Sequence, residues 1–202
     1  KKILRVADPK KNLNTGINVA ETLTKMISTI GENLDLRRSA ILQVDKGIVS
    51  GYMHNALQPG LGKIGVLIAL ESEGDSGKLE ILGKQLAMHV AAANPQALSR
   101  NDVDVDDLQR EKTILTEQAQ ESGKPNEIIE KMVEGRLRKY FEETCLLDQT
   151  YVIDGESKVS KAVELAEKEI GSSVLIKGFV RFALGEGIEK TEGDFAAEVA
   201  AA

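Results

Sequence analysis

Cysteine and aromatic residues are scarce in this sequence. Among 202 residues, Cys145 is the single cysteine, tryptophan is absent, and aromatic side chains make up 3% of the chain. One cysteine excludes an internal disulfide bond and, with two histidines, supplies too few Cys and His ligands for a structural zinc site. The shortage of aromatic rings also argues against the stacking platforms with which proteins hold single-stranded nucleic acid.

Basic clusters and long apolar runs are missing as well. The 26 Lys and Arg residues are outnumbered by 32 Asp and Glu residues, which gives a net charge of −6, and no basic patch is large enough to follow a phosphate backbone. Apolar runs such as residues 64–70 are too short to span a bilayer, and no signal-peptide pattern opens the chain. We expect a cytoplasmic protein with no membrane or direct nucleic-acid partner. Because the chain opens on Lys1 rather than Met, we also expect a fragment or a processed chain.

Motifs that bind phosphate or catalyse a reaction are absent from the pattern too. Gly62-Lys63 and Gly123-Lys124 each place a lysine after a glycine, but a phosphate-binding loop needs Ser or Thr next, where Ile64 and Pro125 stand. No Ser/His/Asp set, carboxylate pair or metal-ligand spacing stands out. The sequence therefore predicts neither an enzyme nor a cofactor site, and it favours a protein that acts by binding.

The two histidines each have a structural and a functional interpretation. His54 follows a predicted strand and precedes a loop at residues 55–61, so we expect it at the mouth of that loop. It is either a polar side chain in water or a general base, and a base would need a hydrogen-bonded partner that the sequence does not nominate. His89 stands among apolar positions of a predicted helix, and we expect it on the flank of that helix with its polar atoms satisfied by the fold.

Helical spacing and alternating patterns predict the elements of the first half. Residues 19–30 have apolar side chains at every third or fourth position, and Gly31 suits the left-handed residue that ends a helix. Predicted strands at 38–44, 48–53 and 63–70 form a three-stranded antiparallel unit whose first turn is at 45–47. Residues 79–93 predict a helix packed on that sheet and ending at Asn94-Pro95.

The middle of the chain predicts a helical hairpin. Residues 102–120 are acidic with a thin apolar stripe, and residues 126–140 carry a matching stripe. Between them Gly123 suits a helix end and Pro125 a helix start. At 1.5 Å per residue each arm would be about 25 to 30 Å long, so we expect a projecting antiparallel pair, or coiled coil.

After the hairpin the pattern returns to sheet and helix. It predicts a strand at 145–153, an amphipathic helix at 157–170, a long strand at 173–184 and a short Ala-rich helix at 191–202. The whole is an α+β arrangement of antiparallel sheets packed with helices, an inserted helical hairpin and a short C-terminal helix.

Two apolar pairs leave alternatives open. Ile30-Gly31 is either the ordinary end of a helix or a place where the small glycine lets another backbone come close. Val152-Ile153, just before Asp154-Gly155, is either the end of a core strand or an exposed apolar pair.

Several segments, taken in order, carry a resemblance to a known family. They are Ile30-Gly31-Glu32-Asn33 with Leu36-Arg37-Arg38, Tyr52-x-His54 followed by Gly62-Lys63-Ile64-Gly65, Met88-His89-Val90-Ala91-Ala92, the turn SGKPNEIIEKMVEGR at 122–136, Gly178-Phe179-Val180-Arg181-Phe182, and Asp194-Phe195-Ala196-Ala197-Glu198-Val199. From Val19 onward the chain resembles bacterial elongation factor Ts.

The resemblance implies a guanine-nucleotide exchange factor for elongation factor Tu in protein synthesis. Such a factor binds the GDP-bound and the nucleotide-free GTPase, disturbs its Mg²⁺ and phosphate site, and so promotes GDP release without covalent chemistry. By position, the resemblance implies that Ile30-Gly31 and His54 approach the GTPase domain of the partner and that Val152-Ile153 rests on its third domain. Phe195 and Val199, in the C-terminal helix, would pack on the GTPase domain.

The resemblance also implies a division of the chain. Residues 1–37 would be the remainder of an N-terminal core subdomain, 38–100 with 143–190 a C-terminal core subdomain, 101–142 the inserted hairpin and 191–202 a C-terminal helical module. The family carries a small N-terminal helical domain and a Thr-Asp-Phe-Val motif beside the Mg²⁺ site, and neither occurs in this sequence. We therefore expect binding to elongation factor Tu with weak stimulation of GDP release.

The main alternative is a self-associating binding module with little exchange activity. An antiparallel helical pair can form a four-helix contact with its twin, which would give a homodimer through the hairpin. An acid/base enzyme that uses His54 and a nearby carboxylate is a third and weaker interpretation.

Overall fold

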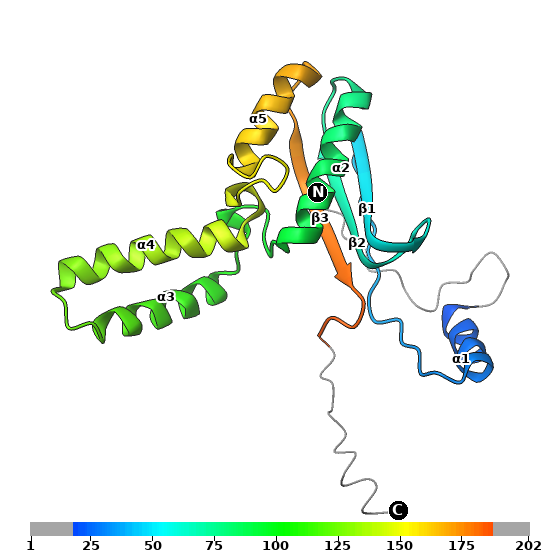
Figure 1. The fold of residues 1–202 in the computed structure, drawn as a ribbon, viewed down its shortest axis with the longest axis horizontal. Coiled ribbons are helices and arrows are strands. Elements are labelled where there is room, and N and C mark those ends of the chain that lie inside the picture. The colour runs from blue at the N-terminus through cyan, green and yellow to red at the C-terminus, as the bar shows by residue number, and fades with distance from the viewer. Residues whose placement is uncertain (1–17, 188–202) are drawn as a thin grey trace, which may run out of the picture.

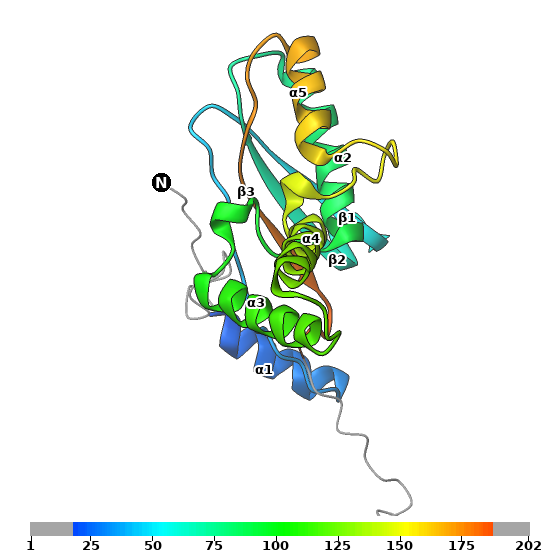
Figure 2. The ribbon, with the colours of Figure 1, turned by 90° about the vertical axis from the view of Figure 1, so that its left-hand side faces the viewer.

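The structure, a computed structural model, describes residues 18–187. Figure 1 shows a β-sheet with helix α2 (Ser76–Ala93) along one face, and a pair of helices, α3 (Val105–Gln120) and α4 (Asn126–Thr144), that projects to one side. Helices α1 (Val19–Ile30) and α5 (Val159–Ile170) lie at opposite ends of the molecule, as both views show (Figures 1 and 2).

The sheet is antiparallel and its strands are ordered β1-β2-β3. Strands β1 (Gly47–Gln58) and β2 (Leu61–Glu71) form a long hairpin whose turn contains Gly60 at φ 79°, a conformation that favours glycine. Strand β3 (Leu175–Ala183) returns from the far end of the chain and pairs with β2. The strand that comes last in the described chain therefore lies beside the central one.

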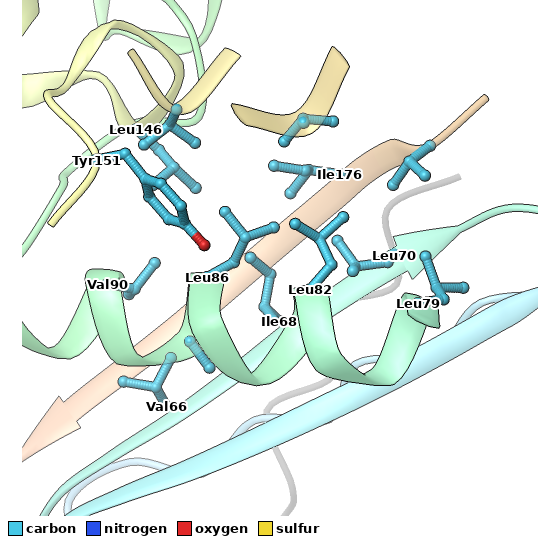
Figure 3. Packing of buried hydrophobic residues seen from close by; sticks show 14 of the residues in the cluster. Val66, Ile68, Leu70, Leu79, Leu82, Leu86, Val90, Leu146, Tyr151 and Ile176 are labelled. Carbon is cyan, nitrogen blue, oxygen red and sulfur yellow. The ribbon is translucent and has the colours of Figure 1, made fainter. Parts of the chain in front are cut away.

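Helix α2 and the inner face of the sheet form the main core. Asp75 caps α2 by accepting a hydrogen bond from the backbone N–H of Lys78 at 2.9 Å, and Asn94 ends the helix in the left-handed conformation. The side chains that α2 and β2 bury against each other are Leu79, Leu82, Leu86 and Val90 with Val66, Ile68 and Leu70. Figure 3 shows them gathered around α2, with Leu146, Tyr151 and Ile176 from later parts of the chain completing the cluster. Burying each large side chain of this kind stabilises the fold by about 1.5 to 3 kcal/mol.

The hairpin of α3 and α4 has a small core of its own. Ala119, Ile129 and Val133 are buried between the two helices, and Arg136 reaches across to Gln118 with a hydrogen bond of 3.0 Å. Gly123 has φ 65°, as the predicted turn requires, and Asp104 caps α3. The structure confirms the α+β class and the inserted helical hairpin, whereas its coiled-coil character stays a prediction.

The predicted three-stranded unit had the wrong first strand. Residues 38–44 form no strand; the three strands are instead β1, β2 and the distant β3. The alternation around Ile41 and Val44 suits a pleated surface, but a strand also needs a partner ladder, and among the described residues β1 pairs only with β2. The described part of the chain thus contains one sheet rather than several.

The strand predicted at 145–153 is also wrong. Residues Leu146–Asp148 form a 3₁₀ turn, η2, followed by a tight turn, and only isolated bridges such as Ala97 with Cys145 occur. The apolar run arises because Cys145, Leu146 and Tyr151 are all buried, the last two in the main core with residues of α2 and α5, although no strand lies beside them. The predicted helices at 19–30, 79–93 and 157–170 and the strands at 63–70 and 173–184 are confirmed within a few residues. The helix predicted at 191–202 lies outside the described residues.

Candidate partner-binding surface

Ile30 and Gly31 stand at the exposed end of α1. Asn18 caps the start of this helix by accepting a hydrogen bond from the Glu21 N–H at 2.8 Å, and Gly31 ends it at φ 78° with its own N–H donating to the Ile27 carbonyl. Gly31 is therefore a helix-ending glycine, as one interpretation predicted. Ile30 is nonetheless 52% exposed, and no heavy atom lies within 4 Å of where a Cβ on Gly31 would be. Both residues are open to a partner.

A cluster around Glu186 fastens the segment that follows α1 to the end of β3. The Glu186 carboxylate accepts hydrogen bonds from Arg38 at 2.8 Å and from Arg181 at 3.1 Å, while its backbone carbonyl accepts one from Arg37 at 2.5 Å. Arg38 also lies over the Phe182 ring, 4.7 Å from its centroid. The hydrogen bond from Arg38 is the main reason that the pKa of Glu186 is lowered from its ordinary value. This Glu186 cluster holds Arg37 and Arg38, in the segment after α1, beside the end of β3.

His54 is an exposed residue within strand β1. It was predicted at the mouth of a loop, but β1 continues to Gln58, and His54 is paired with Ile64 of β2. Its Nδ1 lies 3.3 Å from the Tyr52 hydroxyl. The prediction was wrong because β1 continues past His54 through an irregularity, with Asn55 at φ 50° and a register shift between Ala56 and Gln58, where the sequence indicated a loop. His54 remains available at the surface, on a strand rather than a loop.

Val152 and Ile153 form the tip of a tight turn and are 45% and 44% exposed. The turn is closed by hydrogen bonds from Gly155 N–H to the Tyr151 carbonyl at 2.8 Å and from Tyr151 N–H to the Ser157 carbonyl at 2.7 Å. Asp154 accepts hydrogen bonds from the backbone of Glu156 and Ser157, and the Ser157 hydroxyl holds it too. Of the two open alternatives, the exposed apolar pair is the correct one.

His89 lies directly beneath this turn. It was expected on a helix flank, but its side chain is fully buried; the expectation that the fold satisfies its polar atoms is confirmed. Nδ1 accepts a hydrogen bond from the Val152 N–H at 3.2 Å, and Nε2 lies 2.9 Å from Gln149 Oε1. Burial lowers the pKa of His89 from its ordinary value of 6.5, and the bond to Gln149 opposes that shift. The imidazole is therefore neutral at pH 7.

Tyr151 completes the support of the turn. Its ring lies 5.8 Å from the His89 ring, centroid to centroid, and its hydroxyl donates to Gln85 at 3.3 Å. Burial, followed by the nearby Asp154 charge, raises the pKa of Tyr151 to about 12, so it stays neutral. The contacts of His89, Gln149 and Tyr151 were not predicted because residues 60 positions apart in the chain meet only through the fold.

The structure leaves the predicted site residues on three separate elements. Ile30 and Gly31 end α1, His54 lies in β1, and Val152-Ile153 follows η2. Phe195 and Val199 lie outside the described residues. Within residues 18–187, no group of three or more His, Cys, Asp or Glu side chains is placed to hold a metal ion, and no helix there is long and apolar enough to cross a membrane.

The predicted site residues that the structure describes are exposed side chains held by a well-bonded backbone. Comparison with known proteins shows the family of the chain. A family model described as Elongation factor TS matches residues 4–186. The chain belongs to the elongation factor Ts family. Proteins named elongation factor Ts from Rhodospirillum centenum and Rhodospirillum rubrum are 62% and 59% identical to it over 186 residues, which cover 92% of this chain. The protein of that name from Paramagnetospirillum magneticum is 60% identical over 187 residues.

The chain spans about three fifths of these elongation factor Ts relatives, since the matches cover 60 to 61% of their lengths. Membership of the family is confirmed by these matches, as the motifs from Ile30 to Arg181 predicted. The contact roles of individual residues remain proposals.

Proposed function

We propose that this chain promotes guanine-nucleotide exchange on elongation factor Tu in protein synthesis, acting by binding and without covalent chemistry. The observation that carries the proposal is the family match over residues 4–186. Exposed apolar side chains at Ile30, Val152 and Ile153, each beside a well-bonded backbone, support it, because such anchors cost little entropy when a partner covers them.

Exchange by binding requires a difference in affinity. A factor that binds the nucleotide-free GTPase more tightly than the GDP-bound one lowers the affinity for GDP by the same ratio. We propose that Ile30-Gly31 and His54 contact the GTPase domain, and that Val152-Ile153 rests on the third domain of elongation factor Tu, with Phe195 and Val199 packing on the GTPase domain. In this scheme the contacts near the phosphate site disturb Mg²⁺ and phosphate, and the others hold the complex together.

The test is the rate of labelled-GDP dissociation from elongation factor Tu. We expect the chain to bind the nucleotide-free GTPase but to accelerate GDP release less than the full-length Rhodospirillum centenum relative, because the Thr-Asp-Phe-Val motif is absent from this sequence. The variants His54→Ala and Val152→Ala should each weaken binding about tenfold, the effect typical of a contact that anchors an interface, with little change in melting temperature.

A matched control separates anchors from ordinary exposed side chains. Leu165 on α5 is 49% exposed and has no proposed contact, so Leu165→Ala should leave binding unchanged. Equal weakening by Leu165→Ala and Val152→Ala would contradict the assignment, and no binding of elongation factor Tu by the wild-type chain would overturn the proposed function.

Self-association is a second candidate, favoured by one observation on the hairpin. Val105 and Ile114 on α3 and Ile128 on α4 are exposed although the hairpin buries a small core of its own. A second copy could cover them in a four-helix contact. Light scattering with and without elongation factor Tu distinguishes a homodimer from a monomer, and a monomer at all concentrations would exclude this candidate.

A further inference from the structure

One buried side chain ties the exposed Val152-Ile153 pair to the core. The hydrogen bonds from Gly155 and Ser157 described above shape the turn from within, among residues 151–157. The bond from Val152 N–H to His89 Nδ1, at 3.2 Å, instead joins the turn to helix α2. His89 is fully buried, and α2 belongs to the main core, so this bond is made to a rigid element.

The bonding pattern fixes the tautomer of His89. Because the Val152 N–H can only donate, Nδ1 must be the unprotonated nitrogen, and Nε2 carries the proton of the neutral ring. Nε2 then donates to Gln149 Oε1 at 2.9 Å, and the Gln149 amide nitrogen donates to the Glu143 carbonyl at 2.7 Å, in the last turn of α4. A single line of hydrogen bonds thus runs from α4 through Gln149 and His89 to the exposed turn.

We propose that His89 is a positioning residue for partner binding, which holds the Val152-Ile153 turn in the conformation that presents both side chains to an apolar surface of the partner. The proposal rests on the proposed function, in which that partner is elongation factor Tu. Without the acceptor at Nδ1, the Val152 N–H loses its hydrogen-bond partner on α2. The turn then spends part of its time away from the position that this bond fixes. Apparent affinity falls in proportion to the fraction of molecules in the competent conformation.

Two variants of similar polarity separate this role from simple core filling. In His89→Asn the side-chain amide reaches the level of Nδ1 and can accept from Val152, but it cannot reach Gln149. In His89→Gln the amide reaches the level of Nε2, so the bond to Gln149 is kept and the acceptor for Val152 is lost. Both leave part of the imidazole volume empty, so a purely structural role predicts similar losses for the two.

The experiment measures the hydrogen-exchange rate of the Val152 amide and the affinity for nucleotide-free elongation factor Tu. We expect His89→Gln to speed Val152 exchange and to weaken binding about tenfold, while His89→Asn stays within about twofold of wild type in both measurements. Equal effects of the two variants on exchange and affinity would overturn the proposal. So would faster Val152 exchange in His89→Gln with unchanged affinity.

A measurement on the wild-type chain keeps the proposal testable if the variants fail to fold. Ring ¹⁵N chemical shifts of His89 should show the proton on Nε2 and an unprotonated, hydrogen-bonded Nδ1 at pH 7. The opposite tautomer would overturn the proposal. The exchange and tautomer measurements need no partner and test the role of His89 alone. Failure of the wild-type chain to bind elongation factor Tu would instead refute the proposed function.

Discussion

Gly83 of helix α2 packs closely against Ser50 of strand β1. It sits in the middle of α2, where glycine costs about 1 kcal/mol in helix propensity relative to alanine. A Cβ at this position would overlap the Ser50 hydroxyl of β1 and lie 2.8 Å from the Ser50 Cβ. The absence of a side chain lets α2 approach the sheet. The sequence shows a glycine inside a helical pattern, but the reason for it is tertiary.

Replacing Gly83 by alanine should therefore destabilise the protein despite the better helix propensity. We expect Gly83→Ala to lower the free energy of unfolding by about 1 to 3 kcal/mol, the usual cost of overpacking a core, measured by urea denaturation. Gly135, in α4, is the matched control because a Cβ there would meet nothing within 4 Å. Gly135→Ala should stabilise by about 0.5 to 1 kcal/mol; a stabilising Gly83→Ala would contradict the close approach.

In the candidate site, too, the contacts of His89 are tertiary and could not be predicted from the local sequence. Its place in a helical pattern indicated a residue satisfied by the fold, which is correct. Its partners Gln149 and Val152 could not be predicted, because no local pattern relates them to α2. The apolar character of Val152 likewise could not show whether it is buried or exposed, since its neighbour Tyr151 is buried whereas Val152 is exposed.

Among the elements, the helices and the strands at 63–70 and 173–184 were predicted, whereas two further apolar runs were predicted as strands but have no pairing partner. Helix α1 has apolar spacing, a capping Asn18 and an ending Gly31, all of which are local. Residues 38–44 and 145–153 contain apolar runs without the partner ladder that a strand needs. Strand pairing is a property of two segments, so a pattern in one of them cannot establish it.

The base of the α3/α4 hairpin is held by an ion-pair cluster centred on Asp148. Arg100, in the short turn η1 (Arg100–Asp102) that leads into α3, makes two hydrogen bonds to this carboxylate, at 3.0 and 2.7 Å. Lys158, at the start of α5, lies 3.7 Å from Asp148 and 3.2 Å from Glu142 of α4. Three elements, η1, η2 and the start of α5, therefore meet at the Asp148 carboxylate, and Lys158 links them to α4 through Glu142. The hydrogen bond from Arg100 is the main cause of the lowered pKa of Asp148.

A charge at Asp148 should stabilise the protein in a pH-dependent way. Since its pKa in the fold is below the ordinary 3.8, this stabilisation is complete above that value and is lost as pH falls through the folded pKa. We expect Asp148→Asn to cost about 1 to 2 kcal/mol at pH 7, and the difference from wild type to shrink below pH 3.8 in urea denaturation. Glu80→Gln, in an exposed pair with Lys84, is the control and should cost less than about 0.5 kcal/mol. A difference for Asp148→Asn that is constant with pH would contradict this account.

In the molecule as a whole, the candidate contacts are spread over distant elements, so their relative positions depend on a few links between them. The Glu186 cluster is such a link, because Arg37 and Arg38 belong to the segment after α1, whereas Arg181 belongs to β3 and Glu186 to the turn that follows it. Helix α1 has no buried residue of its own. The position of Ile30 and Gly31 relative to the sheet therefore depends strongly on this cluster.

Removing the Glu186 carboxylate should loosen that segment while the core stays folded. Trypsin cleaves after arginine, so Glu186→Ala should speed cleavage at Arg37 and Arg38 by about fivefold through local opening, with little change in melting temperature. The control is Glu73→Ala, which removes a carboxylate from an exposed pair with Lys46 and should not change cleavage at these sites. If Ile30 and Gly31 contact elongation factor Tu as proposed, Glu186→Ala should also weaken binding. Unchanged cleavage would mean that other contacts hold the segment, and the cluster would then have no part in placing α1.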